Sequence, residues 1–298
     1  MISRYLIVGL IAIGVLGFSC KKKTVNIHEN LIVEGNTPPP YDGVSSTQIE
    51  VYVNKLHIDL LGIQVSDTDL ATYTQYLKQQ NLSVASRDSV IDVILSKQQY
   101  YERLFALLSG RMLEGINEFQ LQDEINTYTF ITQQLYSSGD TLNAQIVEYE
   151  NAKLIALKQS DSLYMEGDIT VNQLYAAFSN NVIYDEINMG SLNFMIACFE
   201  NYLYRSPTAQ ETTNGTEMVD GQSRPILQSD GDSKNDFINI ITTCNEFYQG
   251  LVIENFTSYL SRRPTSQEMF DFTELVKTSN NLEELKKNIL NTDEYAGF

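Results

Sequence analysis

The side chains that most often carry out catalysis are scarce in this sequence. Its 298 residues include two histidines, three cysteines and no tryptophan. A Ser-His-Asp or Cys-His site needs an imidazole held against a nucleophile, and only His28 and His57 could supply one. His57 lies beside an apolar helical stripe, so we interpret it as a structural histidine. The sequence therefore predicts no catalytic histidine.

Recognisable cofactor and metal motifs are also absent from the sequence. It has no Gly-x-Gly-x-x-Gly or Walker-type loop for nucleotides and no Cys-x-x-Cys-His for covalent haem. Residues 230–236 alternate hard oxygen ligands as calcium loops do, but Lys234 stands at the fifth position and Asn235 replaces the turn glycine. We interpret residues 212–236 as a solvated polar loop, with calcium binding as the alternative. We expect no catalytic residue, no cofactor and no metal ligand.

The charge balance excludes nucleic acid as a partner. Lys and Arg number 20 against 38 Asp and Glu, which gives a formal net charge of −18. Nucleic acid repels so acidic a chain at long range, and 43% hydrophobic residues are too many for a disordered acidic tail. The enzyme class that the composition leaves possible is a hydrolase that uses two carboxylates. With so many acidic residues, some pair of carboxylates always lies at a separation suitable for catalysis.

The N-terminus has the features of an export signal. Arg4 precedes an apolar run over residues 5–16, shorter than the ~20 residues that span a bilayer, and a serine and Cys20 follow before three lysines. A small residue directly before a cysteine resembles the lipobox of bacterial lipoproteins, and this form with following lysines is typical of Bacteroidetes. We expect a cleaved signal peptide at residues 1–19, a lipid on Cys20 and a flexible tether at residues 20–47. An uncleaved anchor and cleavage without a lipid are the alternatives.

These features predict attachment to a membrane through the lipid. An acidic body does not lie on an anionic membrane surface, so the acyl chains on Cys20 would hold the protein there. The residues after Cys20 are basic, unlike the acidic run that marks surface export in some Bacteroidetes lipoproteins. We therefore expect a location in the cell outer membrane, facing the periplasm.

Two segments of the chain match closely. Residues 202–211 and 259–268 share the order Tyr-Leu-x-Arg-x-Pro-Thr-x-Gln-Glu, and residues 60–69 are a more divergent copy with Val65 at the proline position. Proline cannot continue a helix, and a threonine followed three residues later by a glutamate caps the next helix. We interpret both arginines as structural, bonding the helix end, with anion binding as the alternative. The predicted helix corners consist of Arg205, Pro207, Thr208, Glu211, Arg262, Pro264, Thr265 and Glu268.

A second signature follows each corner. At residues 94–100, 243–247 and 289–295 an apolar helix ends in a polar residue and the chain restarts on an aromatic. The sequence therefore predicts a unit of corner, two helices and aromatic anchor, repeated three times.

The segment between the first and second copies predicts an inserted helical hairpin. Residues 101–190 have helical periodicity, with breaks near residues 137–140 and 166–168. The patterns together predict an all-α protein of helical repeats. We expect a first helical unit with its insert at residues 48–190 and two further repeats at residues 191–298.

The repeats carry a resemblance to known families. Residues 52–62, 66–69 and 96–103 resemble the helical domain of unknown function found beside cytochrome c modules in planctomycete surface proteins, although Val65 stands where that family has proline. The later two copies are similar to the Leu-Gly-Arg-x-Pro and Ser-x-Glu-Tyr repeats of phycobilisome-linker-like modules on bacterial surface proteins. The resemblance implies a helical scaffold or interaction module and brings no catalytic residue.

Two cysteines remain after lipidation. Cys198 and Cys244 both belong to the second repeat, and an exported protein meets an oxidising environment. A disulfide between them is one expectation, and two buried free thiols are the alternative.

The sequence favours binding over catalysis. We expect a membrane-tethered, non-enzymatic lipoprotein that acts as a helical scaffold or protein-interaction module in the cell envelope, with another envelope protein as partner. The alternative is a glycan-capture lipoprotein of a paired outer-membrane importer, which would contact sugars through some of the 18 tyrosines. An envelope hydrolase with two carboxylates in one cleft is the third.

Overall fold

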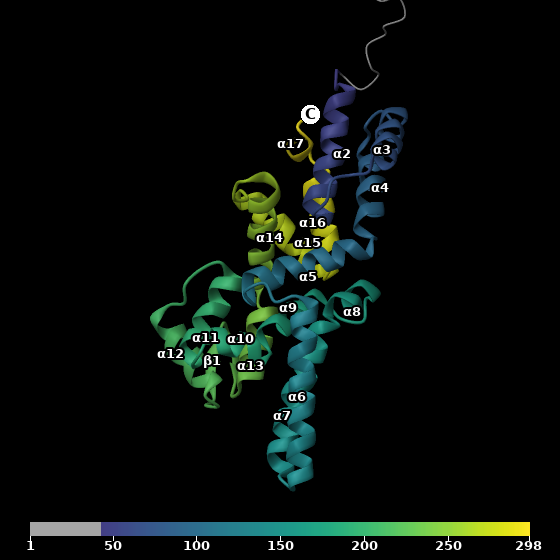
Figure 1. The fold of residues 1–298 in the computed structure, drawn as a ribbon. Helices are drawn as coiled ribbons and strands as arrows, with labels where there is room; N and C mark the ends of the chain where they lie inside the picture. Colours follow the sequence, from purple (N-terminus) through teal and green to yellow (C-terminus); the bar gives the residue numbers. More distant parts are fainter. Residues whose placement is uncertain (1–42) are drawn as a thin grey trace, which may run out of the picture. The chain divides into compact units, whose positions relative to one another are not determined.

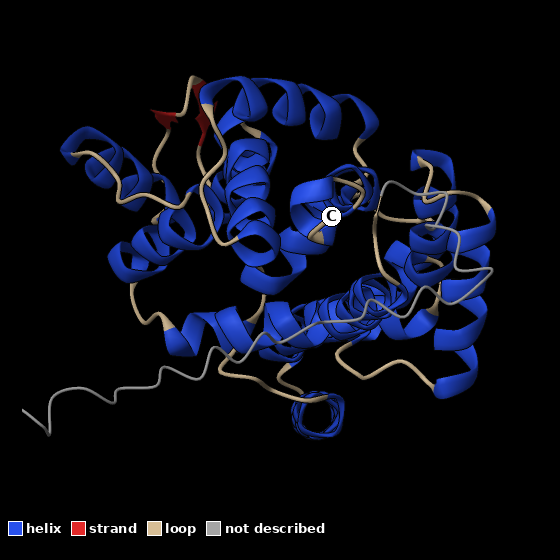
Figure 2. Ribbon diagram, turned by 90° about the horizontal axis from the view of Figure 1, so that it is seen from above, coloured by secondary structure: helices blue, strands red, loops and turns tan. Residues whose placement is uncertain are grey.

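The structure, a computed structural model, describes residues 43–298, and these are almost entirely α-helical (Figure 1). Within them the strands are two three-residue segments that pair as an antiparallel ribbon (red in Figure 2). The all-α fold class predicted from the sequence is therefore correct. The predicted signal peptide at residues 1–19, Cys20 and most of the predicted tether lie outside the described residues.

The elements follow the chain in three groups. The first group is α2 (Ser46–Leu61), α3 (Asp67–Gln79), α4 (Val84–Leu95) and α5 (Gln98–Met112). The second group is α6 (Glu118–Ser138), α7 (Thr141–Lys158), α8 (Ser160–Glu166), α9 (Val171–Ser179) and α10 (Val182–Ile187). The third group is α11 (Ser191–Cys198), the π-helical turn η1 (Phe199–Leu203), α12 (Ala209–Val219), β1 (Arg224–Ile226), β2 (Ser229–Gly231), α13 (Lys234–Thr243), α14 (Asn245–Leu260), α15 (Ser266–Ser279), α16 (Leu282–Leu290) and α17 (Asp293–Ala296).

Local sequence signals set the helix boundaries of the insert. Gly139 ends α6 in the left-handed conformation, with φ of 84°, and the side chain of Asp140 caps α7. Gly167 ends α8 in the same way, and Thr170 begins α9 through a capping box. Both helix breaks therefore fall where the sequence predicts them.

Helices α6 and α7 form an antiparallel hairpin, here called the arm. They pack along a narrow seam in which Asn151 Nδ2 donates a hydrogen bond of 2.9 Å to Thr129 Oγ1. The loop end of the arm lies away from the other helices of the described unit (Figure 1). The buried residues of α6 and α7 are Leu121, Ile125, Thr132, Ala144, Asn151, Leu154 and Leu157.

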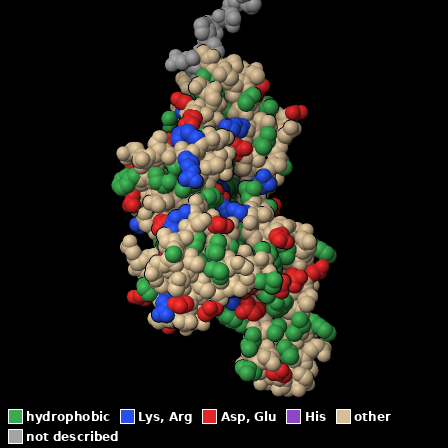
Figure 3. All heavy atoms as spheres, turned by 90° about the vertical axis from the view of Figure 1, so that its left-hand side faces the viewer, with side chains coloured by type: hydrophobic (Ala, Val, Ile, Leu, Met, Phe, Trp, Pro, Cys, Tyr) green, Lys and Arg blue, Asp and Glu red, His purple; other side chains and the backbone are tan. Residues whose placement is uncertain are grey.

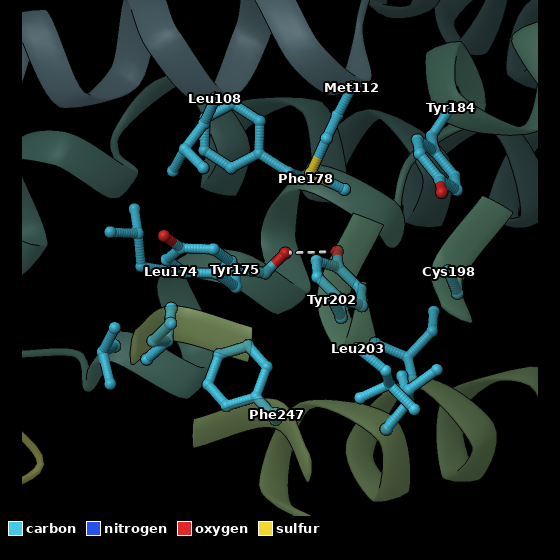
Figure 4. Packing of buried hydrophobic residues seen from close by; sticks show 14 of the residues in the cluster. Leu108, Met112, Leu174, Tyr175, Phe178, Tyr184, Cys198, Tyr202, Leu203 and Phe247 are labelled. Atoms are coloured by element: carbon cyan, nitrogen blue, oxygen red, sulfur yellow. Dashed lines mark hydrogen bonds between the residues drawn. The ribbon is translucent and has the colours of Figure 1, made fainter. Parts of the chain in front are cut away.

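The larger of two buried clusters joins helices from α5 to α16. At its centre the ring of Phe247 meets those of Tyr175 and Tyr202 edge-on, with centroids 5.4 and 6.1 Å apart. The hydroxyl of Tyr202 donates to the carbonyl of Tyr175 at 2.8 Å (Figure 4). This cluster contains residues on both sides of position 190, so the predicted boundary there does not divide the core. Helices of the insert and of the later repeats bury their apolar faces against each other.

The smaller buried cluster joins the N-terminal helices to the C-terminus. It contains residues of α2, α3 and α4 together with Leu290 and Tyr295. The hydroxyl of Tyr52 donates to the carbonyl of Leu290 at 3.2 Å, and Arg87 pairs with Asp293 at 2.7 Å. The first and last predicted repeats therefore share a core, although they lie at opposite ends of the described chain.

Candidate functional site

The two closely matched corners have the same capping geometry. Thr208 is the N-cap of α12: its hydroxyl accepts from the N–H of Glu211 at 3.3 Å, and the Glu211 carboxylate accepts from the N–H of Thr208 at 2.7 Å. Thr265 and Glu268 repeat both contacts at the start of α15, with the same two distances. The sequence predicts a capping box at both places, and both are present.

The chain leaves the preceding helix in the same way at both corners. Tyr204 and Ser261 take left-handed conformations with φ of 53° and 55°. Pro207 and Pro264 then stand directly before the N-cap threonines, in the extended connection. The left-handed residue ends the helix, and the proline, which restricts the backbone, prevents the helix from continuing.

Arg205 uses all five of its N–H groups inside the protein. Two bonds go to Glu211, at 2.9 and 2.7 Å, two go to Glu246, at 2.5 and 3.1 Å, and one goes to the carbonyl of Ser206, at 3.2 Å. These contacts leave Arg205 no donor for an anion. The hydrogen bonds from Arg205 lower the pKa of Glu211 from 4.5 to about 2.

Arg262 makes the equivalent set of contacts. It bonds Glu268 at 2.8 and 2.7 Å, Glu294 twice at 2.7 Å, and the carbonyl of Arg263 at 3.1 Å. The structural interpretation of both arginines agrees with this geometry, with one correction. Their main partners are carboxylates, because a planar guanidinium matches two carboxylates better than single helix-end carbonyls.

The second glutamate of each network, Glu246 or Glu294, was not predicted from the sequence to bond the arginine. Glu246 and Glu294 each stand directly before the aromatic anchor of the second signature, and Gln99 occupies that place in the first copy. The shared spacing of arginine, capping glutamate and pre-aromatic glutamate is the signal that could have identified them.

The first corner lacks the arginine network. Ser66 caps α3 by accepting from the N–H of Asp69 at 3.1 Å, but Ile63 stands where the later corners have arginine. Gly62 ends α2 with φ of 73°, and the side chain of Arg103 packs so closely on it that a Cβ there would lie 3.1 Å from Arg103 Cδ. An arginine from α5 thus covers this corner.

Both described cysteines are free thiols, so the possible disulfide between Cys198 and Cys244 is not formed. Cys198 is fully buried, and burial raises its pKa to about 12. The Sγ of Cys244 instead donates to the carbonyl of Ile241, in the last turn of its own helix, at 3.4 Å. The two sulfur atoms are therefore held among different neighbours, and the alternative of two free thiols describes the structure.

The polar segment after the second corner is ordered, which corrects the predicted solvated loop. Residues 212–236 contain most of α12, the β1–β2 ribbon and the start of α13. Asp236 accepts from the hydroxyl of Ser233 at 2.7 Å at the start of α13. Within residues 43–298, no group of three or more His, Cys, Asp or Glu side chains is placed to hold a metal ion.

His57 lies where the sequence predicts, inside α2. It is 2% exposed, its Nδ1 lies 2.9 Å from the carbonyl of Val53, and burial lowers its pKa. These contacts agree with a structural role.

A cavity of about 240 Å³ lies between α2, α5, α14 and α16 and is here called the charged cleft. Four charged side chains from four different helices line it, together with the hydroxyl-bearing Tyr259. The four are Asp59, Arg103, Glu254 and Lys286.

The two carboxylates of the charged cleft are already hydrogen-bonded. Asp59 accepts from the hydroxyl of Tyr295 at 2.8 Å. Glu254 pairs with Arg111 at 2.8 Å and accepts from the hydroxyl of Tyr175 at 3.3 Å. Two carboxylates thus share one cleft, but both are engaged as acceptors by neighbouring side chains.

The cations of the charged cleft have hydrogen-bond donors without a partner. Lys286 is 6% exposed, and its ammonium donates to the hydroxyl of Tyr100 at 2.9 Å; burial lowers its pKa to about 8. The Nε of Arg103 is buried with no hydrogen-bond partner. In the described part of the chain the Tyr259 hydroxyl also lacks a partner.

The sequence analysis did not single out these charged residues. One signal was present for Lys286, which falls on the apolar face of α16 beside Leu282, Leu285 and Ile289. Asp59, Arg103 and Glu254 carry no comparable signal, since charged residues on helices usually face solvent.

The arm presents exposed apolar side chains. On α7, Leu142, Ile146 and Tyr149 are 69%, 54% and 53% exposed and follow the spacing i, i+4, i+7, which places them on one face, away from the seam. On α6, Phe119 and Phe130 are 74% and 60% exposed. Figure 3 shows hydrophobic side chains gathered over the lower end of the molecule, where the arm lies.

A groove of about 750 Å³ lies at the base of the arm. Its apolar lining comes from α5, α6 and α7 and includes Phe105, Leu121 and Ile155. Charged side chains from α5 to α8 border it, namely Glu102, Glu118, Lys158 and Asp161.

Comparison with known proteins gives no match: no protein-family model, curated protein or solved structure resembles this chain. Among the described helices, none combines the length and apolarity needed to cross a membrane.

Proposed function

We propose that this protein is a lipid-anchored, non-enzymatic interaction module of the bacterial cell envelope, which binds another envelope protein through the arm. The observation that carries the proposal is the exposed stripe of Leu142, Ile146 and Tyr149 on α7. The anchor rests on the sequence, where Cys20 follows a signal-like apolar run, and with it the location in the outer membrane facing the periplasm.

The composition of the seam supports a binding role for the arm. Three of the seven buried residues of α6 and α7 are small or polar, namely Thr132, Ala144 and Asn151. A two-helix hairpin with so thin a core gains stability when a further helix covers an outer apolar face. The stripe on α7 has the spacing that one amphipathic partner helix would cover.

The charge of the arm indicates the chemistry of the partner. Residues 118–158 contain six acidic and two basic side chains. Asp123, Glu124 and Glu148 are exposed on the arm. The partner is therefore a helix with an apolar stripe and basic flanks, because opposite charge steers association and disfavours other pairings.

The two alternative functions have less support. A hydrolase needs a carboxylic acid free to donate a proton, whereas Asp59 and Glu254 both accept bonds from neighbouring side chains and Glu254 is ion-paired. Glycan capture through tyrosines needs exposed tyrosine side chains, and among the described residues only Tyr76, Tyr136 and Tyr149 are exposed.

Site-specific photocrosslinking tests the proposal. A photoreactive amino acid at position 146 is compared with one at position 270, since Phe270 is 65% exposed but lies on α15. In the bacterium that makes the protein, position 146 should give a protein adduct of one discrete mass, and position 270 should give none.

Matched variants provide the control. Ile146→Asp should abolish copurification of the crosslinked protein, while Phe270→Asp should leave it unchanged, with equal helical circular dichroism for both. Equal crosslinking at the two positions, or adducts of heterogeneous mass that glycosidases remove, would contradict a protein partner at the arm.

A further inference from the structure

The charged cleft contains an imbalance between donors and acceptors. Its carboxylates, Asp59 and Glu254, accept hydrogen bonds from Tyr295, Arg111 and Tyr175. Its cations are not used to the same extent, because Lys286 has one hydrogen-bond partner, the Tyr100 hydroxyl, and the buried Nε of Arg103 has none.

We propose that the charged cleft binds a small oxyanion, a carboxylate or a phosphate group, through Arg103, Lys286 and Tyr259. Buried polar groups are nearly always hydrogen-bonded, so the buried Nε of Arg103, which has no partner among the described residues, indicates a missing acceptor. Carboxylate and phosphate accept several charge-assisted bonds at once, which neutral ligands do not. This site is independent of the arm and of the function proposed for it.

Lys286 supports the site because its burial is unfavourable by itself. Its side chain is 6% exposed and makes one hydrogen bond, to the Tyr100 hydroxyl, although an ammonium has three donors. A charge removed from water with an incomplete set of partners destabilises a fold. An anion in the cleft would supply the missing partner.

Arg103 also lacks the hydrogen-bond partners that the two corner arginines have. Arg205 and Arg262 each bond two glutamates and a carbonyl, whereas the described residues provide no hydrogen bond or ion pair to Arg103. Its guanidinium is held in place by packing on Gly62 at the end of α2. A guanidinium that is fixed but unpaired loses little conformational freedom when it binds a ligand.

The repeats give an internal comparison for Tyr259. The tyrosine at the equivalent position of the second corner is Tyr202, and its hydroxyl donates to the carbonyl of Tyr175 at 2.8 Å. The hydroxyl of Tyr259 has no such partner in the described residues, and its residue lines the cleft. The same repeat position therefore serves packing in one copy and is free to bind a ligand in the other.

The cavity limits the size of the ligand. A volume of about 240 Å³ lies at the low end of ordinary ligand pockets, which range over roughly 300–1,000 Å³. It suits an inorganic anion or the carboxylate end of a small molecule.

Titration of the purified full-length chain in a neutral detergent tests the proposal. Sodium phosphate and sodium acetate are added separately at constant ionic strength, with sodium chloride as the reference, and the amide resonances of residues that line the cleft are followed by NMR. Saturable shifts with a millimolar or lower Kd are expected for at least one anion and not for chloride. Tighter binding of acetate identifies a carboxylate ligand, and tighter binding of phosphate identifies a phosphate ligand.

Variants decide whether the binding occurs in the cleft. Arg103→Met, Lys286→Met and Tyr259→Phe should each raise the Kd, the first two by about tenfold or more, as expected for loss of a charge-assisted bond. Tyr259→Phe removes one hydroxyl that has no partner, so it preserves the fold. Arg263→Met, at an exposed arginine outside the cleft, should leave the Kd unchanged. Absence of saturation with both anions, or equal Kd values in all four variants, would overturn the proposal.

Discussion

Gly250 packs directly against the backbone of Tyr202. A Cβ on Gly250 would lie 2.0 Å from the carbonyl oxygen of Tyr202, well inside van der Waals contact. At this point α14 crosses the end of η1. The missing side chain therefore sets the distance between η1, which leads into the corner at Thr208, and α14, which leads into the corner at Thr265.

Gly250→Ala should lower the free energy of unfolding by about 2 kcal/mol or more, because the backbone must shift to admit a methyl group. Gly110 provides the matched control, since it lies in α5 with open space where its Cβ would be. Gly110→Ala should raise the free energy of unfolding by about 0.5–1 kcal/mol through helix propensity. Urea melts of both variants measure the difference, and equal effects would contradict the close contact.

Thr208→Ala and Thr265→Ala should each lower the free energy of unfolding by about 1 kcal/mol, because each threonine caps a helix through a capping box. Thr213 is the control: it is exposed within α12, and its hydroxyl bonds only the carbonyl of Ala209 in the same helix. Thr213→Ala should change the stability little. Equal urea midpoints for the three variants would show that neither corner threonine stabilises the protein as a helix cap.

The corner glutamates should make the protein sensitive to acid. Hydrogen bonds from Arg205 and Arg262 lower the pKa values of Glu211 and Glu268 from 4.5 to about 2 in the folded state. The unfolded state then binds more protons between these values, so the stabilisation is complete above pH 4.5 and is lost as the pH falls toward 2.

Chemical denaturation at several pH values checks this expectation. The stability difference between the wild type and Glu268→Gln should be constant above about pH 5 and should shrink toward zero near pH 2. Glu274→Gln, at an exposed glutamate of α15, is the control and should give a flat difference. A difference for Glu268→Gln that does not vary with pH would argue against the ion pair.

Lys286 should make the stability of the protein depend on pH in the alkaline range, because its burial in the charged form is unfavourable. Burial lowers its pKa in the folded state from 10.5 to about 8, although the nearby carboxylates of Glu283 and Glu254 raise it. The ammonium donates a hydrogen bond to the Tyr100 hydroxyl. Below pH 8 both states are protonated and the burial cost is fully present. Between pH 8 and 10.5 the unfolded state binds more protons, so the contribution of Lys286 to stability rises with pH.

Lys286→Met removes this cost and should stabilise the protein at pH 7 by up to about 3 kcal/mol. The difference in the free energy of unfolding between Lys286→Met and the wild type should decrease as the pH rises from 8 to 10.5. Urea melts across this range test it, with Lys277→Met, at an exposed lysine of α15, as the control. A variant that is less stable than the wild type at pH 7 would contradict the cost of burial.

Cys20→Ala should move the protein out of the detergent phase in phase partitioning, because the proposed membrane anchor is a lipid on Cys20 and not a basic surface. The helical circular dichroism should not change, because Cys20 lies outside the described helices. Continued partitioning of the variant into detergent would favour an uncleaved N-terminal anchor over lipidation.

Features that depend on near neighbours along the chain could be predicted from the sequence. The helix breaks at Gly139 and Gly167 and the capping boxes at Thr208 and Thr265 involve residues at most four positions apart. Such contacts form from backbone conformation and local hydrogen bonds, and they are readable wherever glycine, proline and capping residues occur at fixed spacing. The all-α class follows from the same signals.

The contacts between residues that are distant along the chain could not be predicted from the sequence, because they depend on how the helices pack. Lys286 reaches Tyr100 from 186 positions away, Arg205 takes its second carboxylate from Glu246, 41 positions away, and the two cysteines of one repeat remain unbonded. The packing of whole helices sets these distances, because it fixes which face of each helix is buried and against what. A charged residue on a helix has the same appearance in the sequence whether it faces solvent or a cleft, and the charged cleft therefore emerges only when four helices are brought together.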